Sequence, residues 1–216
     1  MNKTDTILLS TAYLAPIQYY CKLISYQNIY IEAVENYTKQ SYRNRCNILS
    51  ANGLLSLSIP VNKTDNLKVY TKDIRIDYNS RWPLIHQRAI ESAYRSSPFY
   101  IYYADDIIPL FEKKFEFLLD FNTEFQNIVT ELIGIKINVK FTSDFKKVEN
   151  TDFDDFTDLI SPKSSKQKPD NTFHCVSYYQ VFEQKFGFIP NLSILDLLFN
   201  MGPSTIDVLN SCISKT

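Results

Sequence analysis

The stretch from Glu35 to Val61 constrains the fold of this chain most, because it predicts a β-hairpin. Two short runs with strand-like alternation lie on either side of Asn52-Gly53. Asn and Gly both tolerate a positive φ, so such a pair between two strands is typical of a tight hairpin turn. The residues just ahead of the turn, 40–47, include two arginines, two asparagines and a tyrosine. A rigid hairpin that presents several hydrogen-bond donors is suited to an anion or a polyhydroxylated ligand.

The residues before this hairpin predict a βαβ unit. Thr6 to Leu9 is a short apolar run typical of a buried strand, and the stretch from Asn28 to Ala33 predicts a second strand. Between them, Pro16 precedes an amphipathic stretch from Ile17 to Ile24, and proline is favoured in the first turn of a helix. After the hairpin, Asp73 to Asp77 alternates and predicts a strand whose two isoleucines face inward.

The middle of the chain, from about residue 81 to 133, changes to a helical period. A helix is predicted over 81–94, because one of its faces repeats every four residues: Trp82, His86, Ile90 and Tyr94. Pro98 begins a second helical stretch that runs to about residue 110. Residues 111–133 predict a third helix with an apolar stripe, and Gly134 is placed to end it.

The last third of the chain mixes strand, loop and helix patterns. Residues 135–141 alternate and predict a strand, whereas 146–171 are first acidic and then rich in Ser, Lys and Pro, which predicts a solvated, mobile loop. β-forming residues resume at 174–182, a helix is predicted over 192–200, and a short helix ends the chain. Together these patterns predict an α/β fold in a single domain over 1–216: a mixed sheet with flanking helices and a central helical segment.

Composition excludes several classes of protein. The net charge is −1, so no overall field favours nucleic acid, and the 4 glycines leave no Gly-rich phosphate loop. The four cysteines are far apart without a CxxC pair, so we predict free thiols and no metal site. The polar N-terminus lacks a signal peptide and no apolar run reaches about 18 residues, which predicts a cytoplasmic protein without a membrane span. The cofactor and the oligomeric state stay open.

Arg43, Asn44 and Arg45 form the first candidate site. Successive residues of a strand point to opposite faces, so the two arginines are expected on one face and Asn44 on the other. Two neighbouring guanidinium groups are able to hold a phosphate or a carboxylate. The alternative is a solvated strand edge, where pairs of like charge are also common.

Two titratable side chains on predicted helices are candidates for catalysis. His86 lies one helical turn from Trp82, and a histidine on an aromatic face is able to stack on a sugar or act as a general base. The alternative is a hydrogen-bonded histidine on a half-buried helix face. Asp196 lies inside an otherwise apolar helix, where a carboxylate must find a partner or have its pKa raised. We interpret it either as a structural anchor or as a catalytic acid.

Several motifs resemble the WbqC-like protein family, and they extend over nearly the whole chain. Tyr13-Leu14 and Tyr19 resemble the opening motif of that family, and residues 40–45 with 57–61 resemble its Asn-Arg hairpin. Trp82 and His86, continued by Tyr94 and Pro98, are similar to its Trp…His helix. The most specific match is Tyr179-Gln180 followed by Phe188-Ile189-Pro190-Asn191-Leu192-Ser193-Ile194-Leu195-Asp196-Leu197-Leu198-Phe199-Asn200-Met201-Gly202.

One motif departs from the family. Many relatives carry His-Gln-Pro at the end of the first strand, where this chain has Leu9-Ser10-Thr11, and they have Pro where this chain has Ala15. If that histidine is the catalytic base of the relatives, this branch rests its chemistry elsewhere, on His86 or Asp196, or it has changed its role.

The resemblance implies a bacterial protein associated with surface-polysaccharide biosynthesis. We therefore expect a transferase-like enzyme that acts on a nucleotide-linked sugar or a similar glycan precursor. Arg43 and Arg45 are expected to hold phosphate next to Asn44, with His86 as the base and Asp196 orienting it. Further ligand contacts are expected from Tyr13, Trp82, Tyr94, Gln180, Asn191 and Asn200. The alternative is a non-catalytic binding or assembly protein of the same pathway, which the missing histidine favours.

Overall fold

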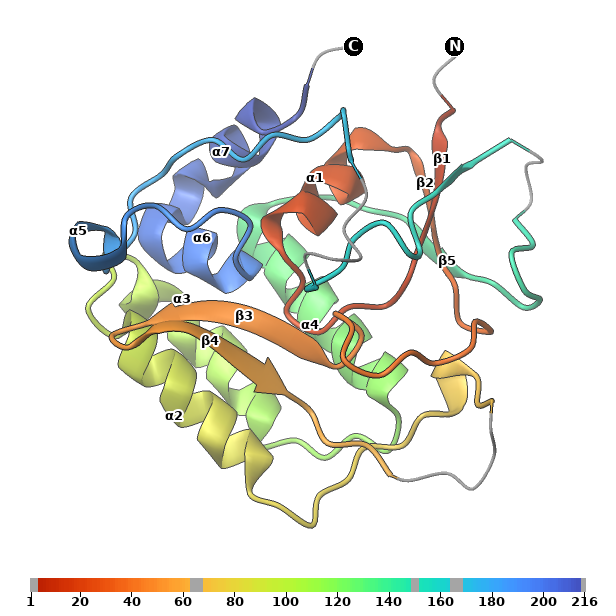
Figure 1. Ribbon diagram of the computed structural model, residues 1–216, viewed down its shortest axis with the longest axis horizontal. Helices are drawn as coiled ribbons and strands as arrows, with labels where there is room; N and C mark the ends of the chain where they lie inside the picture. The colour runs from red at the N-terminus through yellow and green to blue at the C-terminus, as the bar shows by residue number, and fades with distance from the viewer. Residues whose placement is uncertain (1–3, 63–67, 149–151, 164–168, 215–216) are drawn as a thin grey trace.

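The computed structural model describes residues 4–62, 68–148, 152–163 and 169–214, and it contains a parallel sheet of four short strands (Figure 1). The strand order is β5-β2-β1-β6, with the bounds Val139–Phe141, Asn28–Ile31, Thr6–Leu9 and Asp154–Asp155. β1 pairs with β2 from Thr6 opposite Asn28 to Leu9 opposite Ile31, and helix α1 (Ile17–Ser25) connects the two strands. The predicted βαβ unit and the α/β fold class are therefore confirmed.

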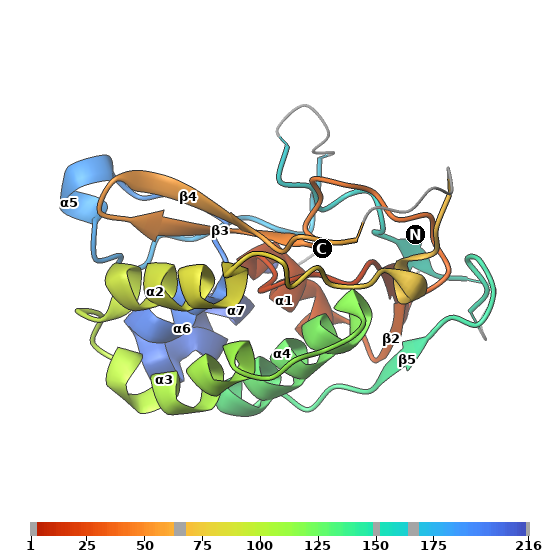
Figure 2. The same cartoon turned by 90° about the horizontal axis from the view of Figure 1, so that it is seen from below.

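The predicted hairpin forms a second, antiparallel sheet, but its turn lies one residue earlier than expected. β3 (Arg45–Ser50) pairs with β4 (Gly53–Ser58), and Ser50 lies opposite Gly53. The loop is therefore Ala51-Asn52, and the positive φ, +99°, belongs to Gly53 and not to Asn52. The hairpin lies over helix α2 (Figure 2) and buries its inward side chains against the helices.

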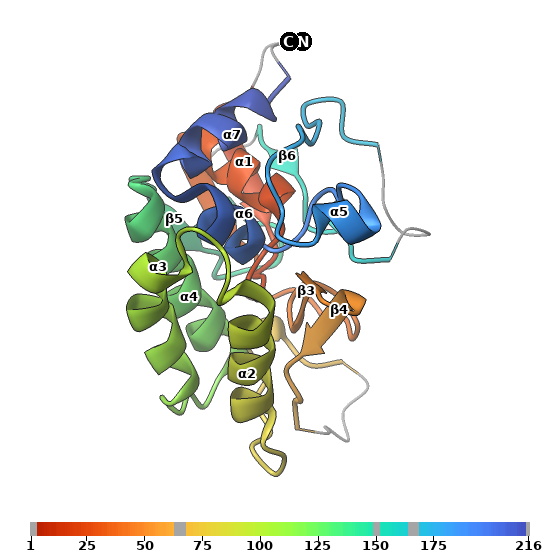
Figure 3. The ribbon, with the colours of Figure 1, turned by 90° about the vertical axis from the view of Figure 1, so that its left-hand side faces the viewer.

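The central helical segment has three helices, as predicted, with a shorter last one. They are α2 (Trp82–Tyr94), α3 (Tyr100–Ile107), which a 3-10 turn over Ile108–Phe111 extends, and α4 (Leu118–Ile133). α2 lies between α3 and the hairpin in Figure 3. The predicted inner face of α2 is confirmed, since each of its four residues is at most 3% exposed. Gly134 ends α4 in the left-handed conformation that its φ of +79° shows, also as predicted.

The last two helices of the chain pack on α1. α5 (Glu183–Phe186) is a single turn, α6 (Ile194–Met201) has Ser193 as its N-cap, and α7 (Thr205–Ser211) follows a 3-10 turn over Gly202–Ser204. α6 packs on α1, α3 and β3, so it joins the parallel sheet to the hairpin through one apolar core. The assignment of the whole chain to a single domain stays a prediction. No helix in the described ranges is both long and apolar enough to cross a membrane.

Two of the predicted strands are wrong. Asp73 to Asp77 forms a 3-10 turn (Thr71–Asp73) and isolated bridges instead of a strand, although its two isoleucines are buried as expected. Residues 174–182 form no strand, and the backbone N–H groups of His174 and Val176 instead donate to the carbonyl oxygen and the Sγ of Cys212, just after α7.

The segment 146–171 is not simply a solvated loop. Asp154 and Asp155 pair with Ile7 and Leu8, so a two-residue strand joins the edge of the parallel sheet, and Thr157 behind it is buried. The mobility predicted for this segment concerns in part residues 149–151 and 164–168, which lie outside the described residues.

Candidate functional site at the carboxyl edge of the parallel sheet

Polar residues follow all four parallel strands and meet at one edge of the sheet. Ser10 follows β1, Glu32 follows β2, Thr142 follows β5, and Thr157 lies two residues after β6. The chain leaves β1 toward β2 and later adds β6 on the other side of β1, so the strand order reverses between β1 and β6. At such a reversal the loops diverge, and parallel sheets bind ligands at the carboxyl ends of the flanking strands. The Ser10 hydroxyl joins the two segments that follow β1 and β6, because it donates to the Thr157 carbonyl oxygen over 2.9 Å.

The centre of this edge is a buried ion pair between Glu35 and Arg43. Arg43 donates from Nε and Nη2 to the two carboxylate oxygens, over 2.6 and 2.5 Å, and both side chains are at most 7% exposed. This two-pronged geometry is the strong form of an arginine–carboxylate contact. Burial raises the pKa of Glu35, although the Arg43 guanidinium acts in the opposite direction.

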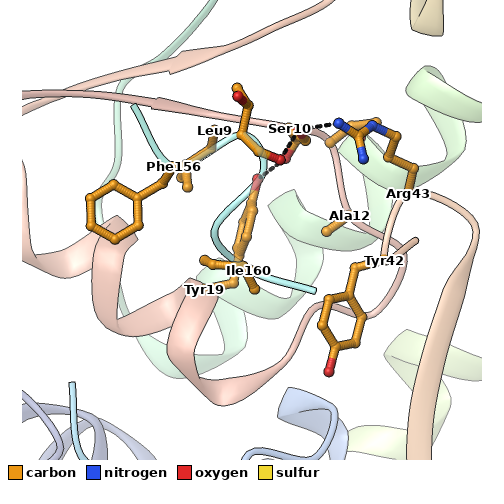
Figure 4. A pocket seen from close by; sticks show the side chains of 10 residues that line it. Leu9, Ser10, Ala12, Tyr19, Tyr42, Arg43, Phe156 and Ile160 are labelled. Atoms are coloured by element: carbon orange, nitrogen blue, oxygen red, sulfur yellow. Dashed lines mark hydrogen bonds between the residues drawn. The ribbon is translucent and has the colours of Figure 1, made fainter. Parts of the chain in front are cut away.

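Ser10 is the polar group that the ion pair holds at the surface of the site. Arg43 Nη2 donates to Ser10 Oγ over 2.7 Å (Figure 4), and the same hydroxyl lies 3.0 Å from Glu35 Oε2. The third guanidinium nitrogen, Nη1, has no hydrogen bond to a described residue. The site therefore offers a hydroxyl group next to a carboxylate, together with one donor of a fixed guanidinium.

A cavity of about 230 Å³, which we call the charged cavity, opens beside this ion pair. Its walls include Glu35, Arg43, Lys146, Thr157 and Asp158. The Lys146 backbone N–H donates to Glu32 Oε2 over 2.6 Å, and its ammonium lies 2.6 Å from an Asp155 oxygen. Three carboxylates, including that of Glu32, and two cations line this cavity, so it suits a polar ligand with hydroxyl groups.

Helix α4 contacts the site through the side chain of Asn122. Asn122 is 1% exposed, and its Nδ2 donates to the Arg43 carbonyl oxygen over 2.8 Å and to Thr11 Oγ1 over 3.1 Å. A buried asparagine is costly unless it makes such bonds, so Asn122 ties the backbone of Arg43 and the side chain of Thr11 to α4. Among the described residues, no group of three or more His, Cys, Asp or Glu side chains is placed to hold a metal ion.

Of the predicted arginine cluster, the structure brings Arg43 to this site but not its neighbours. Arg45 Nε donates to Ser58 Oγ across the hairpin, and Asn44 Nδ2 donates to the Ile59 carbonyl oxygen. The expectation that both arginines share one strand face is wrong, because β3 begins only at Arg45 and Arg43 turns to Glu35. A ligand role of Arg45 and Asn44 stays a prediction.

His86 lies inside an aromatic cluster away from the ion pair. The Tyr13 hydroxyl lies 2.9 Å from its Nδ1, the Trp82 and Phe111 rings lie 5.1 and 6.4 Å from it, and it is 3% exposed. Burial lowers the pKa of His86 to about 4. The ring is therefore neutral at pH 7 and shielded from solvent, which is the arrangement expected of a structural histidine.

Asp196 lies in a second buried cluster. One of its oxygens accepts hydrogen bonds from the Tyr178 hydroxyl over 2.7 Å and from Gln180 Nε2 over 3.0 Å, and burial raises its pKa to about 6. Burial, together with the charge of Asp196, raises the pKa of the nearby Tyr94 phenol. The expectation that Asp196 orients His86 is wrong, because each of the two has other partners.

The two remaining predicted residues make bonds within the fold. Asn200 Nδ2 donates to the Asp196 carbonyl oxygen one helical turn earlier, over 2.7 Å. Asn191 Oδ1 accepts the backbone N–H of Gln18 over 2.9 Å and so satisfies a free donor in the first turn of α1. Asn191 adopts a φ of +55°, which asparagine tolerates better than most residues. Their ligand roles stay predictions.

The residues that the sequence interpretation missed are Ser10, Glu35, Lys146 and Thr157. One signal was present: Ser10 directly follows a fully apolar strand of a predicted βαβ unit, where ligand residues of parallel sheets gather. The pairing of Glu35 with Arg43 had no such signal, because the two lie eight positions apart in an irregular part of the chain.

The fold and the polar residues at the carboxyl edge of the sheet together define an α/β protein with a polar cavity at the carboxyl ends of its parallel strands. The chain belongs to the WbqC-like protein family, whose model matches residues 11–208, so the resemblance of its motifs is confirmed. It is 26% identical to the uncharacterized protein Rv1507c of Mycobacterium tuberculosis, with 82% of this chain and 84% of that protein covered. No solved structure matches the chain.

Proposed function

We propose that this protein is a transferase-like enzyme that acts on a nucleotide-linked sugar or a similar glycan precursor in surface-polysaccharide biosynthesis, and that it binds this ligand at the carboxyl edge of its parallel sheet. The observation that carries the proposal is the arrangement of Ser10, Glu35 and Arg43 where the strand order reverses. The sequence motifs that the chain shares with its family supply the pathway and the class of substrate.

The chemistry of the edge supports such a ligand. Arg43 Nη1 and the Lys146 ammonium are two cationic donors for one phosphate of a nucleotide diphosphate, while hydroxyl and carboxylate groups of the same walls are partners for sugar hydroxyls. Burial raises the pKa of Glu35, and its carboxylate accepts a hydrogen bond from the Ser10 hydroxyl, so it is placed to accept a proton from that hydroxyl. Because Glu35 offsets the charge of Arg43, we expect a modest contribution of phosphate to affinity.

A thermal-shift titration of the purified protein with a panel of UDP-, GDP- and CMP-linked sugars tests the proposal. A ligand that binds only the folded state raises Tm, and Lys146→Ala is expected to remove most of that rise. Lys147→Ala is the matched control, because this neighbouring lysine is exposed and pairs with Asp144 outside the charged cavity. If no member of the panel raises Tm, or if both variants respond as the natural protein does, the proposed site is wrong. Release of free nucleotide during incubation is the test of transfer itself.

A second candidate function is non-catalytic binding or assembly in the same pathway, and one observation favours it. His86 and Asp196, the predicted base and its orienting acid, are 3% and 1% exposed and make internal hydrogen bonds. A ligand that raises Tm in a Lys146-dependent manner without any nucleotide release, with or without added acceptor sugars, supports this function over the enzyme.

A further inference from the structure

A second cavity adjoins the carboxyl edge on the other side of the β1 exit, between α4 and β5. Its volume is about 320 Å³, and its polar side chains are Thr11, Thr123, Gln126, Asn127 and Asn138. All five are uncharged, and none of its other lining residues is charged, so we call it the neutral cavity. Ser10 lines the small crevice beside Arg43, whereas Thr11, the next residue, lines both that crevice and the neutral cavity. The crevice in turn shares Arg43 and Thr157 with the charged cavity, so it connects the linings of the charged and the neutral cavity.

The side chains of the neutral cavity match the hydroxyl groups of a sugar. Amide and hydroxyl groups donate and accept hydrogen bonds at once, as sugar hydroxyls do, whereas an anion requires cationic donors that these walls lack. A cavity of about 300 Å³ or more is in the usual range for small-molecule sites. An uncharged, polyhydroxylated ring is therefore the ligand that this lining recognises best.

Several polar atoms at this cavity have spare bonding capacity. Gln126 is 8% exposed, its Oε1 accepts from the Tyr19 hydroxyl over 3.3 Å, and its Nε2 has no hydrogen bond to a described residue. The Thr123 hydroxyl donates to the Leu119 carbonyl oxygen, which leaves its own oxygen free to accept. Polar atoms left unpaired in a protein interior are costly, and a bound ligand is one way to satisfy them.

An aromatic side chain completes the lining. Phe141, the last residue of β5, is 45% exposed and forms part of the cavity wall. One face of a pyranose ring carries mainly C–H groups, so an exposed aromatic ring beside amide side chains binds the apolar face and the hydroxyl rim of one sugar together. Neither the amides nor the phenylalanine is required by the ion pair of the charged cavity.

We propose that the neutral cavity is a carbohydrate subsite that takes one uncharged pyranose ring. The inference deepens the proposed function, on which it rests for its biological role, since the same edge then holds the charged and the uncharged parts of a glycan precursor side by side. Sugar binding itself can be measured without any nucleotide.

The test is saturation-transfer difference NMR with the methyl glycosides of glucose, galactose and mannose and with N-acetylglucosamine. Asn127→Ala and Phe141→Ala are the test variants, because both side chains are exposed and their removal leaves the core intact. Asn210→Ala on α7 and Tyr102→Ala on α3 are matched exposed controls away from the cavity. We expect at least one sugar to bind, with Kd raised about tenfold by each test variant and unchanged by the controls.

The outcomes separate this inference from the proposed function. Absence of binding by every sugar, or binding that both test variants leave unchanged, overturns the carbohydrate subsite even if sugar nucleotides still bind in a Lys146-dependent manner. Conversely, sugars that bind through Asn127 and Phe141 support the subsite even if no nucleotide-linked sugar raises Tm, and in that case the proposed enzyme is wrong.

Discussion

Two of the buried carboxylates, Glu35 and Asp196, are held in different ways. Burial raises the pKa of both. Glu35 faces a guanidinium and a surface hydroxyl at the wall of a cavity, whereas Asp196 faces the neutral donors of Tyr178 and Gln180 inside the core. The polar groups around Glu35 line a cavity and can contact a ligand, whereas those around Asp196 are bonded to one another within the core.

This difference shows why a raised pKa alone does not mark a catalytic residue. A buried carboxylate that accepts hydrogen bonds from neutral side chains fixes the segments that carry them, in this case 178–180 against α6. A carboxylate paired with arginine at the edge of a sheet instead places charged groups in the wall of a cavity, where ligands of parallel sheets bind. We therefore assign stability to the Asp196 cluster and ligand binding to the Glu35 cluster, and four variants test that assignment.

Glu35→Ala is expected to have the largest effect on stability. It leaves the Arg43 guanidinium, only 6% exposed, without its partner, and a buried ion pair broken in this way costs about 3–5 kcal/mol. Urea unfolding monitored by circular dichroism measures it. The matched control is Glu116→Ala, which breaks the pair with Arg75 where both side chains are more than half exposed, and which should cost at most about 1 kcal/mol. If both variants lose a similar amount of stability, the Arg43 side chain must move into solvent in Glu35→Ala.

Asp196→Asn is expected to change the pH dependence of stability by about 3 kcal/mol. The folded pKa of Asp196, about 6, lies above the ordinary value of 3.8, so its contribution is fully present below pH 3.8 and is lost as pH rises through 6. The folded pKa of His86, about 4, lies below 6.5, so its contribution is present above 6.5 and is lost as pH falls toward 4. The contributions of Asp196 and His86 to stability therefore change with pH in opposite directions. Asp196→Asn removes the contribution of Asp196 and keeps that of His86.

Urea titrations between pH 4 and 7 measure this change. The free energy of unfolding of Asp196→Asn should rise with pH more steeply than that of the natural protein. Asp207→Asn, at an exposed position of α7, is the matched control. Curves that run parallel for the natural protein and Asp196→Asn would show that Asp196 is ionised in the folded state over the whole range.

Local sequence patterns predict the parts of this fold that local forces determine. The β1–α1–β2 unit, the hairpin and the inner face of α2 follow from periodicity, a proline and a glycine. β6 could not be predicted, because Asp154-Asp155 has no strand character of its own and pairs only where β1 offers an edge. For the site, helical spacing correctly places His86 and Asp196 on buried faces, but their partners come from residues 73 and 18 positions away. The contacts of Arg43 likewise depend on how irregular loops close.

Tyr178→Phe is expected to cost about 2 kcal/mol, because Asp196 loses one of its two direct donors inside the core. The neighbouring Tyr179→Phe is a matched control: this side chain is 53% exposed, and its loss should change stability by less than about 0.5 kcal/mol. Thermal unfolding measures both. Any sugar-nucleotide ligand should bind Tyr178→Phe as it binds the natural protein, and a large loss of affinity would move Asp196 from the structural cluster into the ligand site.

Lys146→Ala is expected to have the smallest effect on stability and a clear effect on binding. Its ion pair with Asp155 is partly exposed, at 40% and 34%, so its loss should cost less than about 1 kcal/mol. Its position on the charged cavity predicts that Kd for a ligand found in the thermal-shift panel rises about tenfold in isothermal titration, and more at low salt than at high salt. Lys147→Ala should change neither quantity. If instead Lys146→Ala unfolds the protein as readily as Tyr178→Phe does while binding is unchanged, the carboxyl edge is a structural cluster of the same kind as that of Asp196, and the contrast between the two carboxylates disappears.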